Sequence, residues 1–199
     1  MNPALALVRA DVEAVLNGRF QRLDSLRGQH IFISGGTGFL GTWLLEFVKV
    51  LNECHGFAMR VTVYSRQAKS FASRLPHLGQ IEGVHFEDGD IRYFSEFARD
   101  VRYIIHAAAL TDRRLLASQP SAVAEVNSVG AHRLLRAANL LEDVQKFVLL
   151  SSGLVYGNQP WDLPRVDENF AGAMRCNDVN AVYAESKRFA EVIAHSAIS

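Results

Sequence analysis

The chain has 199 residues, of which 49% are hydrophobic and 21% are charged, and its 21 basic side chains balance its 21 acidic ones. This composition is typical of a globular domain with a sizeable core, and the zero net charge argues against a nucleic-acid-binding role. No apolar run approaches the roughly 18 residues of a membrane-spanning helix. The two cysteines form no CxxC pair, so a reduced, cytoplasmic location is expected, and the histidine spacing suggests no metal site.

The chain begins with a short amphipathic pattern. Apolar side chains recur at helical spacing over residues 3–16, which predicts a helix there. We expect residues 1–28 to form a helical extension that packs on the core, followed by one domain over residues 29–199. No apolar segment followed by a small-residue cleavage site is present near the start, so the pattern is not that of a signal peptide.

From residue 29 onward, apolar runs of β type alternate with helical patterns. The runs are HIFIS (30–34), RVTVYS (60–65), VHFED (84–88), VRYIIHA (101–107) and KFVLLSS (146–152), and the helical patterns cover 39–54, 68–75, 121–142 and 181–197. The runs are nearly continuous in apolar residues, which is typical of strands buried on both faces of a sheet. Alternating strands and helices with short connections predict an α/β fold, a doubly wound parallel sheet of the Rossmann type.

A glycine-rich stretch, FISGGTGFLGTW (32–43), lies between the first strand and the first long helix. Gly35 permits a tight turn, Gly38 lets the backbone approach a pyrophosphate, and Gly41 lets the helix pack closely on the strand. The N–H groups at the start of the helix would face the anion, and the helix dipole favours negative charge there. The cofactor-binding candidates of this segment are Gly35, Gly38, Phe39, Leu40 and Gly41.

The adenosine ribose is expected at the end of the second strand, about 20 residues beyond the loop. An acidic side chain there would accept hydrogen bonds from the ribose hydroxyls, but this chain has Ser65 and Arg66. A hydroxyl and a guanidinium suit a 2′-phosphate, so NADP is modestly favoured over NAD as cofactor. The alternative is that Arg66 is only a solvated surface charge.

Three further motifs follow in order, namely HAAA, SSGLVYG and YAESK. Together with GGTGFLG, they resemble the extended short-chain dehydrogenase/reductase family, and within it the NAD(P)-dependent nucleotide-sugar epimerases and dehydratases. The resemblance covers about residues 29–199. Members of this family are longer, so the resemblance implies that a C-terminal substrate domain is absent from this chain, which could then bind cofactor without turnover.

The resemblance implies further cofactor contacts. Asp90 matches the acid that bonds the adenine amino group, and Ile91 would flank the ring. Asn127 matches an asparagine that holds a helix distortion or a water near the active site. Small residues that line the cofactor cleft are matched by Ala107, Ala108 and Ala109, although these alanines could equally serve close helix packing.

The catalytic candidates are Ser152, Tyr183 and Lys187. Tyr183 and Lys187 stand at i and i+4 and share one helix face. Tyrosine ionises only near pH 10 in water, and a nearby ammonium group stabilises its phenolate. In the family pattern Tyr183 is the base, Lys187 also bonds the nicotinamide ribose, and Ser152 orients the sugar hydroxyl, with Ser151 as the alternative in register. Tyr156 would shape the substrate floor or serve only as a core aromatic.

One departure from the pattern narrows the reaction. Dehydratases of the family carry an Asp-Glu pair after the catalytic hydroxyl, where this chain has Gly153 and Leu154. The expected activity is therefore epimerisation of a nucleoside-diphosphate sugar by transient hydride transfer to nicotinamide. The alternatives are an NADP-dependent reductase of a keto sugar or other carbonyl, and a non-catalytic dinucleotide-binding module. Relatives dimerise through the helices that match 121–142 and 181–197, so a homodimer is expected for the full-length protein.

Overall fold

The structure is a computed structural model that describes residues 3–197. This part of the chain forms two compact units. The first comprises the residues up to Asp90 together with Phe97–Ala107 and Leu141–Val148. The second comprises Ile91–Glu96, Ala108–Leu140 and the chain from Leu149 onward.

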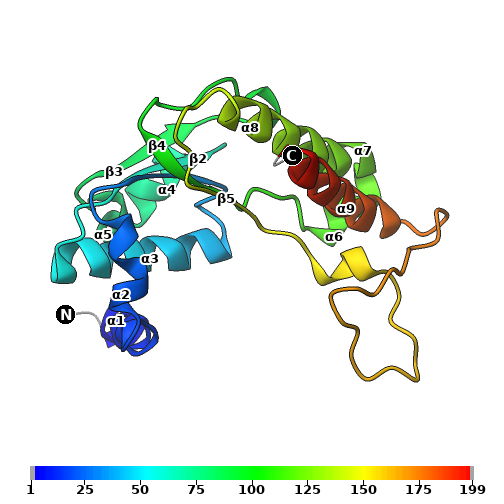
Figure 1. The fold of residues 1–199 in the computed structure, drawn as a ribbon, viewed down its shortest axis with the longest axis horizontal. Helices are drawn as coiled ribbons and strands as arrows, with labels where there is room; N and C mark the ends of the chain where they lie inside the picture. The colour runs from blue at the N-terminus through cyan, green and yellow to red at the C-terminus, as the bar shows by residue number, and fades with distance from the viewer. Residues whose placement is uncertain (1–2, 198–199) are drawn as a thin grey trace. The chain divides into compact units, whose positions relative to one another are not determined.

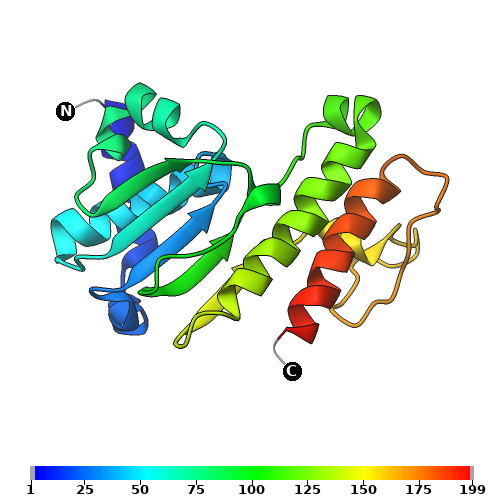
Figure 2. The same cartoon turned by 90° about the horizontal axis from the view of Figure 1, so that it is seen from above.

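The first unit is built on a parallel sheet of five strands, shown in Figures 1 and 2. The strands are β1 (His30–Ser34), β2 (Arg60–Ser65), β3 (Val84–Asp88), β4 (Val101–His106) and β5 (Lys146–Leu149). Their order is β3-β2-β1-β4-β5, so the direction of winding reverses between β1 and β4. This is the strand order of a Rossmann half, and it confirms the predicted fold class.

Helices cover one face of this sheet. They are α1 (Pro3–Leu16), α3 (Phe39–His55), α4 (Ala68–Arg74) and α5 (Pro76–Gly79). The short α2 (Phe20–Leu23) and η1 (Asp24–Leu26) lie between α1 and β1 along the chain. Ile31 and Ile33 of β1 join Val61 and Val63 of β2 in a core with apolar side chains from these helices. All five residues of β1 are buried, as expected for a central strand.

The predicted N-terminal helix is confirmed as α1, and it belongs to this core. Val12 and Leu16 are 0% and 2% exposed among the side chains of the sheet core. Glu13 pairs with His55 near the end of α3, at 3.1 Å. The extension is therefore integrated with the sheet rather than appended to it.

The second unit is mainly helical. It contains η2 (Ile91–Tyr93), α6 (Arg113–Ser118), α7 (Pro120–Ala124), the π-helical turn η3 (Glu125–Val129), α8 (Gly130–Ala138), η4 (Gly153–Tyr156) and α9 (Ala181–Ser196). Figures 1 and 2 both show α8 and α9 side by side, and α9 also contacts α7 and η3. No helix within residues 3–197 is long and apolar enough to cross a membrane.

The helix predicted over 121–142 is the main error in the elements. The chain forms α7, one π-helical turn and α8 instead, and the helix ends at Ala138. A π turn is a single-turn insertion within a longer helix, and the apolar spacing over 121–142 was interpreted as one uninterrupted helix. The predicted range also ran too far, because it included Leu140, which is 78% exposed in the turn that follows α8.

The other boundaries differ less. β4 ends at His106 rather than 107, and β5 ends at Leu149 rather than 152. β5 stops early because the chain turns toward η4, where the Ser152 hydroxyl accepts a hydrogen bond from the Leu154 N–H. The short helices α5 and α6 were not predicted, since each is shorter than two turns.

Candidate functional site

The glycine loop of the first unit has the backbone geometry that its sequence suggested. Gly35 adopts φ of +70°, the left-handed conformation that glycine takes without strain. Gly38 is the N-cap of α3, and no side chain caps that end. The N–H groups of Phe39, Leu40 and Gly41 lie in the first turn of α3. No helical carbonyl group precedes them, so they have no acceptor within the helix. They are therefore donors available to an anion.

Two contacts explain why the loop needs further glycines. A Cβ on Gly41 would lie 2.4 Å from the backbone of Gly36, and a Cβ on Gly36 would lie 2.8 Å from Val63 Cγ1. Gly41 was expected to pack closely on the strand. It instead packs on the loop residue Gly36, which lies between α3 and β2. A Cβ on Gly38 would meet only the Gly35 carbonyl oxygen, at 3.4 Å. The surroundings of Gly38 fit a ligand that comes close to the backbone, as a pyrophosphate does.

The neighbouring strand ends carry the other cofactor candidates of this unit. The Thr37 hydroxyl donates a hydrogen bond to Ser65 Oγ at 3.0 Å, which links the glycine loop to the end of β2. Arg66 is exposed and makes no hydrogen bond or ion pair with the described residues. The Tyr64 hydroxyl donates to the Asp90 carbonyl oxygen at 3.5 Å. Burial and the nearby carboxylates of Asp90 and Glu87 raise the pKa of Tyr64.

The ends of β1 and β4 are tied together where the strand order reverses. The Ala107 N–H donates to the Ser34 carbonyl oxygen at 3.0 Å, and Ser34 Oγ lies 2.6 Å from His106 Nδ1. Ser34 and His106 are 0% and 1% exposed. His106 is thus a buried polar residue at the end of β4, and it fixes the strand that leads into Ala107.

The second unit carries Ile91, Ala108, Ala109 and the catalytic candidates. Ile91 is 5% exposed, and a Cβ on Gly130 would lie 2.7 Å from its Cγ2, so this side chain packs against α8. Ala108 and Ala109 are half-buried. Contact of these three residues with a cofactor stays a prediction.

Lys187 is the most deeply buried of the catalytic candidates. Its side chain lies on α9, the residue is 3% exposed, and Nζ donates a hydrogen bond to the Leu150 carbonyl oxygen at 2.8 Å. This bond joins α9 to the segment that ends in Ser152. Burial lowers the pKa of Lys187 to about 8, an effect that nearby Glu191 opposes. The group therefore titrates closer to neutral pH than an exposed lysine does.

Ser152 and Tyr183 are not hydrogen-bonded to each other in the part of the chain that the structure describes. Both are half-buried, and η4, which Ser152 caps, contacts α9. Tyr156 at the end of η4 donates a hydrogen bond to the Glu168 carboxylate, which raises the pKa of Tyr156.

Asn127 lies in the π-helical turn η3 and is 1% exposed. A helix distortion at this asparagine was expected from the family resemblance, and the structure has one. Asn127 Nδ2 donates to Ser186 Oγ at 3.1 Å, while Asn127 Oδ1 is buried with no hydrogen-bond partner among the described residues. Ser186 was missed from the sequence, because a serine inside YxxxK has no distinctive spacing of its own.

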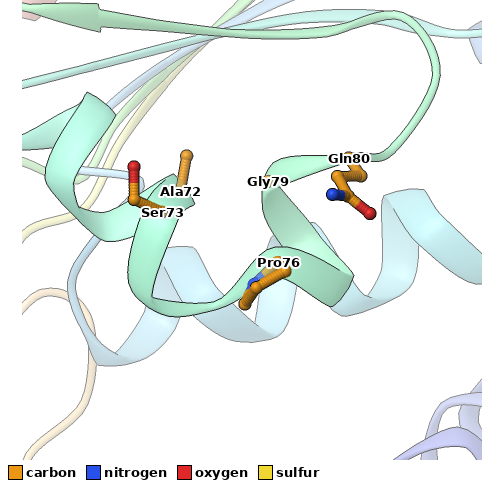
Figure 3. Close-up of a pocket in the computed structure, with 5 residues that line it drawn as sticks. All are labelled: Ala72, Ser73, Pro76, Gly79 and Gln80. Atoms are coloured by element: carbon orange, nitrogen blue, oxygen red, sulfur yellow. The ribbon is translucent and has the colours of Figure 1, made fainter.

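A hollow of about 240 Å³ lies elsewhere in the first unit, between α4 and α5 (Figure 3). Its lining consists of Ala72, Ser73, Pro76, Gly79 and Gln80. None of these side chains ionises, and none belongs to the predicted site. The hollow therefore offers no reactive group.

The sheet order and glycine loop together define a Rossmann-type dinucleotide-binding protein. Residues 31–199 match the NAD dependent epimerase/dehydratase family. The chain belongs to this family, and the resemblance to extended short-chain dehydrogenases/reductases is confirmed.

Two curated relatives illustrate the range of activities. The chain is 29% identical to vestitone reductase of Medicago sativa over 147 residues, which cover 70% of this chain and 43% of the relative. It is 29% identical to a UDP-glucose 4-epimerase of Rickettsia bellii (strain OSU 85-389) over 130 residues, covering 63% and 37%. The chain thus spans less than half the length of these relatives.

Solved structures share the fold. A UDP-glucuronic acid 4-epimerase from Bacillus cereus, in complex with NAD and a fluorinated UDP-glucuronic acid, matches with a TM-score of 0.68 and 21% identity. The match covers 85% of this chain and 52% of that one. The UDP-Glc/GlcNAc 4-epimerase of Campylobacter jejuni matches with a TM-score of 0.67 and 22% identity, covering 85% and 49%.

The burial of Lys187 predicts that the stability of the protein depends on pH. Because folding lowers the pKa of Lys187 from 10.5 to about 8, the unfolded chain binds more protons than the folded chain between these pH values. The free energy of unfolding should therefore rise as pH increases from about 8 to 10.5. The rise is on the order of 3 kcal/mol. Urea denaturation at several pH values measures it.

The Lys187→Met variant isolates this contribution, since methionine fills a similar volume without a charge. Its unfolding free energy should lack that part of the pH-dependent rise, while other titrating groups contribute equally to both proteins. Identical pH profiles in the two proteins would show that the ammonium is not buried in the native state.

Proposed function

We propose that the protein is an NAD(P)-dependent nucleotide-sugar epimerase. The observation that carries this proposal is the hydrogen bond from Lys187 Nζ to the Leu150 carbonyl oxygen, at 2.8 Å. It ties the helix of Tyr183 and Lys187 to the segment that bears Ser152. Family membership, and relatives that include UDP-glucose 4-epimerases, support the same reaction class.

The residues of the chain have distinct parts in the proposed reaction. Tyr183 takes the proton from a sugar hydroxyl and later returns it, acting as base and then as acid. Ser152 donates or accepts the hydrogen bond that orients that hydroxyl. Lys187 is half-protonated near pH 8, so its positive charge is available at neutral pH to stabilise the phenolate. A nicotinamide cofactor held at the glycine loop would supply the acceptor and donor of the hydride that leaves and returns to the sugar carbon.

The experiment is a panel of nucleotide sugars incubated with the whole protein and cofactor, with the products resolved by stereochemistry. We expect one sugar to interconvert with its epimer without net consumption of cofactor. An absence of turnover with every sugar, despite cofactor binding, would favour a non-catalytic dinucleotide-binding module instead.

A reductase is the second candidate, favoured by the similarity to vestitone reductase over 70% of the chain. A reductase shares the same proton donor and cofactor but releases its reduced product after one hydride transfer. Stoichiometric consumption of NADPH with a carbonyl substrate would identify this activity and exclude epimerisation as the main reaction.

For the cofactor, we propose a preference for NADP, supported by Arg66, which is exposed and unpaired within residues 3–197. An acidic group on the next strand, Asp88, stands opposite Ser65 in the strand register. Asp88 Oδ1 already accepts a hydrogen bond from the Lys69 N–H at 3.0 Å. A carboxylate engaged with α4 competes less for ribose hydroxyls than a free one does.

The Arg66→Ala variant tests this preference. We expect NADP affinity to fall about 10- to 100-fold, since a charge-assisted phosphate contact contributes about 1.5–3 kcal/mol. NAD affinity should not change. Arg74→Ala, which removes another exposed arginine of the same region, is the control. Equal losses for NAD and NADP, or tighter binding of NAD by the unmodified chain, would refute the preference.

A further inference from the structure

A buried serine lies inside the YxxxK segment of α9. Ser186 is 7% exposed and its hydroxyl makes two hydrogen bonds. It donates to the Tyr183 carbonyl oxygen at 2.9 Å and accepts from Asn127 Nδ2 at 3.1 Å. The serine hydroxyl thus joins the turn that carries the tyrosine to a different helix.

The orientation of the asparagine amide follows from these contacts. A serine hydroxyl has one proton, and here that proton is directed to the Tyr183 carbonyl. Asn127 must therefore donate to Ser186, which fixes its Oδ1 as the atom left without a partner among the described residues. A flipped amide would put two acceptors together and lose the bond, so the link has one geometry.

The link ends in the π-helical turn η3, which contacts α9. The next residue of α9 makes a second tie in another direction, from Lys187 Nζ to the Leu150 carbonyl oxygen. One turn of α9, from Tyr183 to Lys187, is thus fixed at two points, to η3 through Ser186 and to Leu150, after β5, through Lys187. Loss of the first tie leaves that turn free to shift along or around the helix axis.

We propose that Ser186 is a positioning residue, whose bridge between Asn127 and the Tyr183 backbone sets the placement of Tyr183 and Lys187 toward the cofactor and substrate. This inference rests on the proposed function in that it takes Tyr183 and Lys187 as the reacting pair. The Ser186 hydroxyl is buried, and both of its hydrogen bonds are made within the protein, to Asn127 and to the Tyr183 backbone. It acts through the position of its neighbours.

Two substitutions separate the bridge from the volume of the side chain. Ser186→Ala removes both hydrogen bonds, whereas Ser186→Thr keeps the hydroxyl. Ser196→Ala is a matched control, because Ser196 Oγ donates to the carbonyl three residues earlier, Ile193, at 2.8 Å but is exposed and has no second partner within residues 3–197. If Ser186→Ala does not fold, Ser186→Cys takes its place, since a thiol of similar size is only a weak hydrogen-bonding group.

The first measurement is the affinity for NADH and NADPH. It is determined by fluorescence titration at a temperature well below that of unfolding. We expect Ser186→Ala to bind the preferred cofactor about tenfold more weakly, which corresponds to the loss of one buried hydrogen-bond link. Ser186→Thr should restore most of the affinity, and Ser196→Ala should match the unmodified chain. In the whole protein, kcat should fall with Ser186→Ala while KM for the sugar stays nearly constant.

The readouts keep this proposal distinct from the proposed function. If no nucleotide sugar is turned over, the epimerase assignment fails, yet the cofactor affinities still decide the role of Ser186. An unchanged affinity in Ser186→Ala, or an equal loss in Ser186→Ala and Ser186→Thr, would overturn the positioning role. The second result would mean that any change at this site disturbs packing, whether or not the hydroxyl is kept.

Discussion

Turnover of the nucleotide sugar is expected to fall roughly a thousandfold when Tyr183 is replaced by phenylalanine, the size of effect typical of a lost general acid–base group. The ring and its packing on α9 are retained, so the fold should not change. Cofactor binding should be largely intact, because the glycine loop and Lys187 are untouched. Product formation by the whole protein and cofactor fluorescence by the chain measure the two effects separately.

Tyr93→Phe is the matched control for this experiment. Tyr93 lies on η2, its side chain is 75% exposed, and no hydrogen bond holds its hydroxyl among the described residues. The control should react at the unmodified rate. Turnover by Tyr183→Phe within tenfold of the unmodified protein would remove Tyr183 from its role as base. A loss of cofactor binding as large as the loss of turnover would instead point to a binding role.

The central strand of the sheet was predictable because burial on both faces leaves a plain signal in the sequence, whereas the edge strands β3 and β5 are largely exposed. All five residues of β1 (HIFIS) are buried and its three central ones are apolar, and three of the predicted strands match the observed bounds. The glycine turn was predictable for a similar reason, since only glycine takes φ of +70° without strain. In both cases the residue type is determined by its local environment, namely burial in the strand and a left-handed backbone conformation in the turn.

The parts that escaped prediction depend on contacts between distant segments. The bond from Asn127 to Ser186 joins residues on η3 and α9, and nothing in either local sequence specifies the other. The same holds for Lys187, whose partner is a backbone carbonyl that has no sequence signature. The YxxxK spacing predicted one shared helix face for Tyr183 and Lys187, but not which segments hold that face in place.

The glycine loop provides a test in which stability and cofactor binding separate. In Gly41→Ala, the new Cβ would lie 2.4 Å from three backbone atoms of Gly36, which cannot move without displacing the turn. We expect a loss of about 2–4 kcal/mol in the free energy of unfolding, typical of a severe overpacking. Cofactor binding should be lost with it, because the start of α3 moves relative to the loop.

Gly38→Ala is the matched comparison, because its Cβ would meet only the Gly35 carbonyl oxygen, at 3.4 Å, and its φ is −81°. The free chain can accommodate this methyl group with little change in stability. The pyrophosphate cannot approach as closely, so cofactor affinity should fall about tenfold or more even though the fold is intact. Denaturant titration gives the free energy of unfolding of each variant, and cofactor fluorescence gives the cofactor affinity of each. Tight cofactor binding by Gly38→Ala would mean that the dinucleotide does not pass over this residue, because a methyl group at the N-cap of α3 would then obstruct nothing.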